Sequence, residues 1–368
     1  MRKKILLAVA GLFTALIIYI LLDTGRGLES TPLRLTGPEM PYQALREEAT
    51  PILQELLRIQ SIRGNERAAA EKLRAILEKE GIQVRLLHKD GHPDRANLVA
   101  ELIPPNPGGE GVILSSHLDV VEADASEWVV DPFSGAIKEG KIWGRGALDM
   151  KGHTVMALMA FLQLKRSGLQ LRNKVMFLAV ADEETLFEYG SKFLTTEHKE
   201  LFQGYRYVLN EGGLGTVDVA VKGSKIFNIQ FGEKGLLWLK LEAEGESSHG
   251  ARPPHDYAVK KMIRFLQDVQ DMEQGITITK ETERFFYQMG VASPFPNSFF
   301  LKRATNPLVG QILGGIILSN RYLTAMTTNT RSITAVYTNE DEGPNVIGNK
   351  AFAMLDIRLL PGETPDGY

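Results

Sequence analysis

Residues Lys174–Glu184 read KVMFLAVADEE, an unbroken apolar run that ends in three acidic residues. A short apolar run of this kind is typical of a strand buried on both faces of a sheet. Surface glutamate pairs are frequent, but a solvated pair seldom ends such a run. Adjacent residues at a strand end point in different directions, so one of Glu183 and Glu184 can bind a metal ion while the other faces a substrate as a base.

Other acidic and histidine side chains occupy comparable places along the chain. They are His117 and Asp119 after GVILS (111–115), Asp149 within GRGALDMKG (144–152), and Glu211 after YVLN (207–210). If the strands share one sheet, these side chains converge on one edge, where open α/β sheets hold their ligands. One histidine and several carboxylates are what a pair of divalent metal ions requires.

Two of these positions have simpler interpretations. His117 and Asp119 form an H-x-D pair, in which the aspartate can accept the second ring N–H and fix the tautomer, but the pattern alone is common. Asp149 precedes a predicted helix, so it can act as an N-cap. A carboxylate there can also bridge two cations, one oxygen to each. The sequence leaves both roles of Asp149 open.

Helical spacing and apolar runs alternate along the first part of the chain. Helices are predicted at 42–59, 65–79, 150–166 and 191–196, and strands at 84–87, 97–102, 112–115, 175–181 and 207–209. Alternation of this kind predicts an α/β fold, a sheet with helices on its faces.

A second region begins near Gly232. Its predicted order is strand, helix, strand, strand, at 236–243, 257–270, 332–338 and 351–358, which indicates a small α+β domain with an exposed sheet. Residues 276–330 form a long insertion to which the sequence assigns no structure.

The N-terminus carries a basic flank, Met1–Lys4, before an apolar run from Ile5 to Leu22. Such a run is close to the lower limit for a membrane-spanning helix, and the flank predicts that the rest of the chain lies outside the cytoplasm. We predict an uncleaved single-pass anchor over residues 1–22 and a linker over residues 23–42; a cleaved signal peptide is the alternative. The net charge of −3 gives no reason to expect a nucleic acid partner, and zero cysteines exclude thiolate metal ligands.

Five segments in this order resemble the M20 family of zinc aminoacylases and carboxypeptidases, most closely its carboxypeptidase S and N-acyl amino acid hydrolase branch. They are SSHLDVV, WGRGALDMKG, ADEE, LNEGG and NVIG…DIRLLPG. The resemblance runs from about Tyr42 to the end of the sequence. It implies a zinc-hydrolase-type sheet flanked by helices over residues 43–231, and an inserted α+β lid, or dimerisation, domain over residues 232–368 through which a homodimer can form.

The resemblance also implies a site with two zinc ions. His117 and Glu211 would bind one ion, Glu184 the other, and Asp149 would bridge them. Cobalt or manganese would also suit such ligands.

Further residues take their roles from the same resemblance. It implies Glu183 as the general base and Asp119 as the partner of His117. In the second region it implies His249, within GESSHGARP (245–253), as the group that stabilises the oxyanion. Asn345 and Arg358 would hold the substrate, since a guanidinium can fork onto a carboxylate.

The expected function is hydrolysis of an amide bond next to a free carboxylate, in a small peptide or an N-acyl amino acid. The sequence stops just after LPGETPD (360–366), and no histidine follows His255. In the resembling family a final histidine ligand comes later. The alternative hypothesis is therefore a truncated, catalytically impaired homologue that acts as a binding or dimerisation module.

Overall fold

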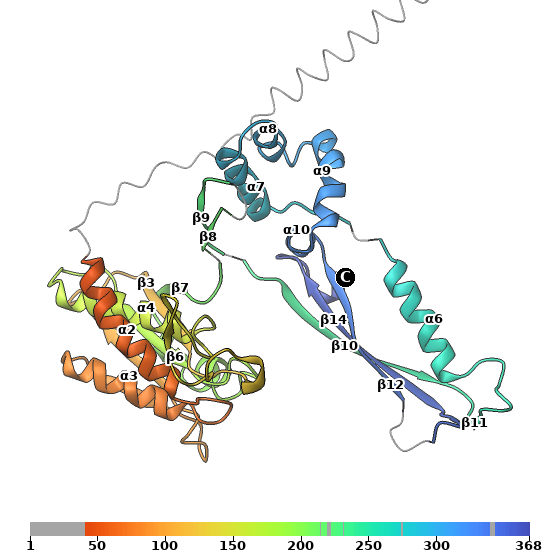
Figure 1. The fold of residues 1–368 in the computed structure, drawn as a ribbon, viewed down its shortest axis with the longest axis horizontal. Coiled ribbons are helices and arrows are strands. Elements are labelled where there is room, and N and C mark those ends of the chain that lie inside the picture. The colour runs from red at the N-terminus through yellow and green to blue at the C-terminus, as the bar shows by residue number, and fades with distance from the viewer. Residues whose placement is uncertain (1–40, 214, 219–221, 231, 274, 339–342) are drawn as a thin grey trace, which may run out of the picture. The chain divides into compact units, whose positions relative to one another are not determined.

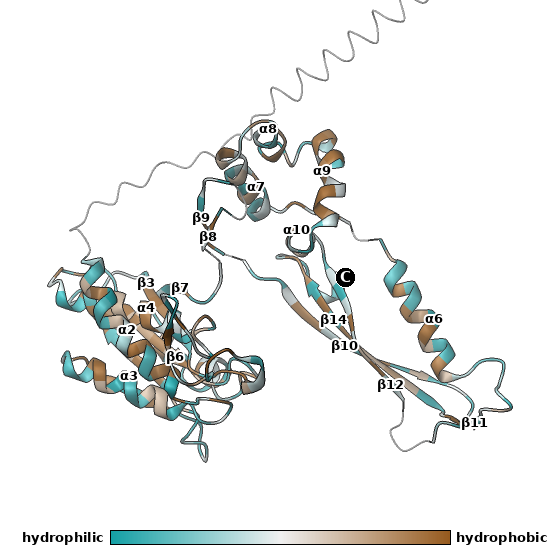
Figure 2. Cartoon of the chain, in the orientation of Figure 1, coloured by the Kyte–Doolittle hydropathy of each residue, from teal (hydrophilic) through white to brown (hydrophobic). Residues whose placement is uncertain are grey.

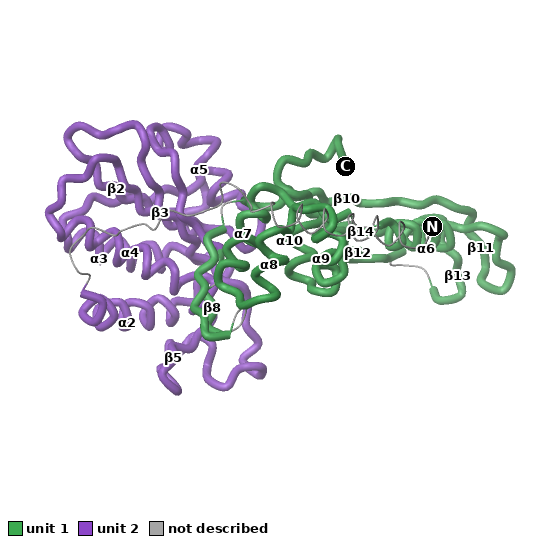
Figure 3. Tube along the Cα trace, turned by 90° about the horizontal axis from the view of Figure 1, so that it is seen from above, with its two compact units in different colours: residues 1–34, 213–368 green, residues 35–212 purple. Residues whose placement is uncertain are grey.

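The computed structural model describes residues 41–213, 215–218, 222–230, 232–273, 275–338 and 343–368 (Figure 1). The described residues form two compact units, one ending at Gly212 and the other beginning at Gly213 (Figure 3). The predicted anchor and nearly all of the predicted linker lie outside the described residues. Within the described part of the chain, no helix has the length and apolar character needed to cross a membrane.

The first unit is built on a mixed sheet. Its strands are β1 (Val84–Leu87), β2 (Asn97–Leu102), β3 (Gly111–His117), β6 (Val175–Val180) and β7 (Tyr205–Leu209), in the order β1-β2-β6-β3-β7. β3 runs parallel to β6 and β7, whereas β2 is antiparallel to both β1 and β6. A small hairpin, β4 (Ile137–Lys138) with β5 (Lys141–Ile142), lies in the long connection after β3.

Helices cover both faces of this sheet. They are α2 (Tyr42–Arg58), α3 (Arg67–Lys79), α4 (Lys151–Arg166) and α5 (Ser191–Glu197). Successive side chains of a strand point to opposite faces. Phe177 of β6 therefore packs in one core with α3 and α4, while its neighbour Leu178 packs in another with Phe193 of α5. Covering both faces explains why these strands read as continuous apolar runs.

Two boundaries differ from the sequence prediction in ways that affect the site. β3 extends two residues further than expected, because His117 still pairs with Val180 of β6. α4 begins at Lys151 with Met150 as its N-cap, and no side chain caps it. The interpretation of Asp149 as an N-cap is therefore wrong.

The second unit contains a three-stranded antiparallel sheet. It consists of β10 (Gly235–Glu244), β14 (Lys350–Leu359) and β12 (Thr330–Thr338), in that order. Met262 and Leu266 of α6 (Ala258–Asp271) pack against Ala353 and Leu355 of β14, so α6 covers one face. Two short pairs also belong to this unit: β8 (Gly215–Val217) with β9 (Lys225–Phe227), and β11 (Ser248–His249) with β13 (Val346–Ile347).

The insertion that the sequence left unassigned is helical. It forms α7 (Lys280–Ala292), α8 (Asn297–Leu301), α9 (Pro307–Ser319) and α10 (Arg321–Thr327). Phe286, Val309 and Leu313 belong to its own small core. α9 contains no charged residue and is hydrophobic over most of its length (Figure 2). A helix without a polar face has no helical periodicity in its sequence, which explains why the pattern was not recognised.

Candidate metal centre

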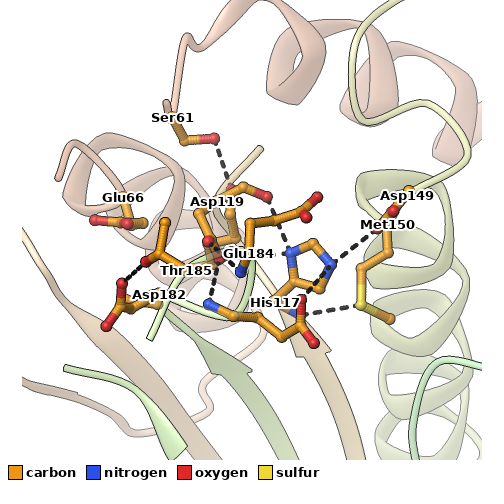
Figure 4. A network of polar contacts seen from close by, with 12 residues as sticks. Ser61, Glu66, His117, Asp119, Asp149, Met150, Asp182, Glu184 and Thr185 are labelled. Carbon is orange, nitrogen blue, oxygen red and sulfur yellow. Dashed lines mark hydrogen bonds and ion pairs between the residues drawn. The ribbon is translucent and has the colours of Figure 1, made fainter. Parts of the chain in front are cut away.

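The carboxyl ends of three parallel strands bring the acidic and histidine side chains together. His117 is the last residue of β3, Glu183 and Glu184 follow β6, and Glu211 follows β7. Because β3, β6 and β7 are parallel, their carboxyl ends meet at one edge of the sheet. Asp149 reaches the same place from the loop before α4 (Figure 4).

The imidazole of His117 lies at the centre of this cluster. The residue is 2% exposed. Its Nε2 lies 3.0 Å from Oδ1 of Asp149, 3.5 Å from Oε2 of Glu211 and 3.9 Å from Oε2 of Glu183. Carboxylates supplied by three different segments of the chain therefore surround a single buried nitrogen.

The other ring nitrogen of His117 fixes the orientation of the imidazole. Nδ1 lies 2.9 Å from the backbone carbonyl oxygen of Asp119 and 3.5 Å from Oδ1 of its carboxylate. A carbonyl oxygen only accepts hydrogen bonds, so Nδ1 carries a proton and donates it. In the neutral ring, the form that binds a metal ion, the Nε2 lone pair then faces the carboxylates.

The carboxylate of Asp119 has a second contact that the sequence did not suggest. It accepts hydrogen bonds from the backbone N–H groups of Glu183, at 3.1 Å, and Glu184, at 2.9 Å. These bonds and the His117 contact hold the pKa of Asp119 below its usual value, although burial alone would raise it. Asp119 thus joins the segment after β3 to the turn after β6.

The electrostatics of the cluster favour a cation. Burial lowers the pKa of His117, but the hydrogen bond and charge of Asp119 and the charge of Glu183 outweigh it and raise the pKa to about 9. Burial raises the pKa values of Glu183, Glu184 and Glu211, and neighbouring carboxylates add to the effect. The arrangement concentrates negative charge that a divalent ion would neutralise.

Donor atoms of the cluster fall into two groups within ion-binding distance. The atoms of His117, Asp149 and Glu184 lie within 4.8 Å of one another, and so do those of His117, Glu183 and Glu211. An imidazole with carboxylates suits zinc, cobalt or manganese. Glu183 belongs to one of these groups, so distance alone does not separate a base from the ligands.

Two neighbours of Asp149 make buried contacts that sequence reasoning missed. Lys151 is 1% exposed, and its Nζ donates to the backbone carbonyls of Leu56, at 2.9 Å, and Ile59, at 2.7 Å, at the carboxyl end of α2. The Sδ atom of Met150 lies 3.2 Å from the backbone nitrogen of His117. Both residues stand in GRGALDMKG, but a lysine in the first turn of a helix gives no sign of burial.

The remaining predicted site residues belong to the second unit. β11 and β13 pair His249 with Val346, which places Nε2 of His249 3.4 Å from Nδ2 of Asn345. Arg358 of β14 forks onto the carboxylate of Asp356, with Nε at 2.7 Å and Nη2 at 3.0 Å. The structure therefore brings His249 and Asn345 together, and it shows the guanidinium of Arg358 engaged by a neighbouring carboxylate.

The fold and the cluster define a class of protein: a mixed α/β sheet with a candidate metal site of histidine and carboxylates at the carboxyl ends of parallel strands. The family model of peptidase family M20/M25/M40 matches residues 113–312, more than half of the chain. The chain belongs to this family, as the resemblance of its motifs predicted.

Curated relatives agree with this placement. The chain is 29% identical over 228 residues to a probable succinyl-diaminopimelate desuccinylase of Staphylococcus epidermidis, an alignment that covers 61% of this chain and 51% of that protein. It is 26% identical over 261 residues to the human N-fatty-acyl-amino acid synthase/hydrolase PM20D1, covering 70% and 51%. The chain spans about half the length of the curated relatives it matches.

Solved structures share the fold. An M20 family metallo-carboxypeptidase, Sso-CP2 from Sulfolobus solfataricus, superimposes with a TM-score of 0.59 at 24% identity, covering 87% of this chain and 72% of that one. Human carnosine dipeptidase 1 gives a TM-score of 0.53 at 18% identity, covering 88% and 73%. At these identities the likeness concerns the fold.

Proposed function

We propose that this chain is a metal-dependent hydrolase that cleaves an amide bond next to a free carboxylate, in a small peptide or an N-acyl amino acid. Membership of a peptidase family supports hydrolysis of peptide or amide bonds. The observation that carries the proposal is the buried His117 Nε2 with carboxylates of Asp149, Glu183 and Glu211 around it. The names of the relatives, a desuccinylase of an amino acid and an N-fatty-acyl-amino acid hydrolase, support an acylated amino acid as one substrate class.

The donor set fits two divalent ions. In this proposal His117 and Glu211 would hold one ion, Glu184 would hold the other, and Asp149 would contribute to both. One of the structures that share the fold is described as a dinuclear metal-binding peptidase of the M20 family, which supports two ions. When bound, such ions supply Lewis-acid polarisation of the scissile carbonyl and lower the pKa of water. Zinc is proposed, and cobalt and manganese suit the same oxygen and nitrogen donors.

Glu183 is proposed as the general base. Its backbone is fixed by the carboxylate of Asp119, while its own carboxylate lies 3.9 Å from Nε2 of His117 and therefore borders the reaction site. A carboxylate placed there can take a proton from the attacking water and deliver it to the leaving amine.

Residues of the second unit are proposed to recognise the substrate. Arg358 would bind the free carboxylate of the substrate. The substrate would then compete with Asp356 for the guanidinium. Asn345 would hold the substrate, and His249 would stabilise the oxyanion. We also propose the division into a catalytic domain (43–231) and a lid (232–368), a homodimer formed through that lid, and a membrane anchor that places the enzyme outside the cytoplasm; the N-terminal sequence supports the last point.

Metal content measured together with turnover tests the proposal. The substrates are dipeptides and N-acyl amino acids. Each is tested in two forms, one with a free carboxyl group and one with that group amidated. We expect hydrolysis of the free acids only. Glu183→Gln should keep the metal content of the wild type and lose turnover, whereas Glu184→Gln should lose one metal ion.

Three results would contradict this function. They are unchanged turnover in Glu183→Gln, equal hydrolysis of amidated substrates, and a metal-loaded wild type that cleaves none of the substrates. The last result would favour the alternative hypothesis of a binding or dimerisation module.

A further inference from the structure

A second cluster of buried charges lies next to the proposed catalytic turn and has no part in the site described above. Arg95, from the segment before β2, is 8% exposed, and it lies between Glu66 (0%) and Asp182 (2%). Its Nη2 donates to Oδ1 of Asp182 at 2.6 Å, and its Nε lies 3.0 Å from Oε2 of Glu66. The contact with Glu66 is an ion pair whose N–H is not aligned for a hydrogen bond.

Asp182 closes the turn that carries Glu183 and Glu184. Its φ of +63° is in the left-handed region, which an aspartate occupies only at a cost that its surroundings must offset. Its backbone oxygen accepts a bond from the N–H of Phe187 at 3.0 Å. Its carboxylate accepts bonds from the N–H of Tyr189, at 3.2 Å, and from the hydroxyl of Thr185 (Figure 4).

The far end of the turn is anchored to the same part of β2. Nδ2 of Asn97 donates to the carbonyl of Tyr189 at 2.8 Å, and Oδ1 of Asn97 accepts the N–H of Ala181 at 2.9 Å. The guanidinium carbon of Arg95 lies 4.7 Å from the centre of the Tyr189 ring, within the range of a cation–π contact. Arg95 therefore touches both the first and the last part of the turn.

The charge balance makes the arginine necessary. Burial raises the pKa of Glu66, and Arg95 opposes this effect. Without the guanidinium, two buried carboxylates would remain unpaired, and an uncompensated buried charge is strongly unfavourable. Asp182 would lose its charged partner at 2.6 Å, and its carboxylate would no longer be held in place to accept the bonds that close the turn.

We propose that Arg95 is a positioning residue, whose buried ion pair with Asp182 fixes the turn 182–189 and thereby aims the carboxylates of Glu183 and Glu184. The backbone of these two glutamates is held from two sides, by Asp119 and by the Asp182 network. The consequence for catalysis rests on the proposed function, whereas the consequence for the turn does not.

Hydrogen exchange of the full chain tests the effect on the turn. Arg95→Met removes the charge, and Arg95→Lys keeps it but loses the planar fork that reaches two carboxylates. Arg85→Met is the matched control, because Arg85 pairs with Glu101 at 2.9 Å on the same sheet with half of its side chain exposed. We expect faster exchange of the Glu183 and Glu184 amides in both Arg95 variants, with unchanged protection of the β2 and β6 amides, and no such change in Arg85→Met.

Zinc affinity, measured by competition with a chelator, tests the link to the site. Residues that support metal ligands typically contribute about 10–100-fold to affinity, and we expect a loss in this range for both Arg95 variants. Unchanged exchange of the turn in either variant, or an equal rise across the whole sheet, would overturn the proposal. Were Arg95→Met not to fold, Arg95→Lys alone would decide. A wild type without hydrolase activity would refute the proposed function, but the exchange comparison would still decide the role of Arg95.

Discussion

Gly190 ends the turn that carries Glu183 and Glu184, and it provides the sharpest stability test in this chain. It is the N-cap residue of α5, and its N–H donates to the carbonyl of Phe187 at 3.3 Å. A Cβ at this position would lie 1.8 Å from the backbone oxygen of Ala181 and 3.0 Å from its carbonyl carbon. Gly190→Ala therefore forces the turn away from the end of β6.

The expected cost follows from the atoms involved. Contacts of a Cβ below 3.0 Å are essentially never found, so the shortfall exceeds 1 Å. Both atoms are fixed by the backbone, and no side-chain rotation relieves the clash. Overpacking a well-packed site costs about 1–3 kcal/mol, and we expect the upper end, ~3 kcal/mol. For a unit of this size each kcal/mol lowers Tm by about 2–4 °C, which gives a decrease of about 6–12 °C.

Thermal unfolding of the full chain, followed by calorimetry, measures this decrease. The matched control is Gly109→Ala, since no heavy atom among the described residues lies within 4 Å of a Cβ there. We expect Gly109→Ala to unfold like the wild type and Gly190→Ala also to lose zinc affinity. A Tm for Gly190→Ala within about 2 °C of the wild type, less than 1 kcal/mol on this scale, would refute the packing argument.

Three further predictions concern the metal, the core and the second unit. Chelation should abolish hydrolysis and zinc should restore it, while far-UV circular dichroism stays unchanged, because both cores of the first unit form without the site; unfolding on chelation would contradict this. Phe177→Ala should lower the free energy of unfolding by about 3–5 kcal/mol in urea titrations, since the ring is fully buried; a loss below ~1 kcal/mol would show that the core collapses around the gap. Burial, with the charge of Arg358, lowers the pKa of Lys234 from 10.5 to about 8, so the folded chain disfavours the ammonium. The free energy of unfolding of the wild type, relative to Lys234→Met, should therefore rise between pH 8 and 10.5; a flat difference would show that the three oxygen acceptors of its Nζ offset the burial.

Much of the first unit could be predicted because its local signals are strong. The apolar run over 175–181 and the strand and helix patterns before it correspond to β1, β2, β3, β6 and the helices between them, with small shifts at their ends. The helical insertion could not be assigned, because α9 is apolar on all sides and the short α8 and α10 carry too little periodicity. The caps of Asn306 and Asn320 were the signals that could have located α9 and α10.

By itself, the sequence determined the chemistry that is available. It placed a histidine and acidic residues after apolar runs, and the continuous apolar character of those runs indicates locally that the strands are buried on both faces. It also carried ordered motifs, and the family match over residues 113–312 confirms the family that they indicated.

The tertiary structure decided which of these groups meet. Only the strand order β6-β3-β7 brings His117, Glu183 and Glu211 to one edge, and only the folded chain shows the Asp119 carboxylate holding the backbone of two glutamates. Arg95 and Asp182 are 87 residues apart, yet they form one buried ion pair. A contact between residues so far apart in the sequence depends on how the strands assemble into the sheet. The local sequence around either residue does not predict it.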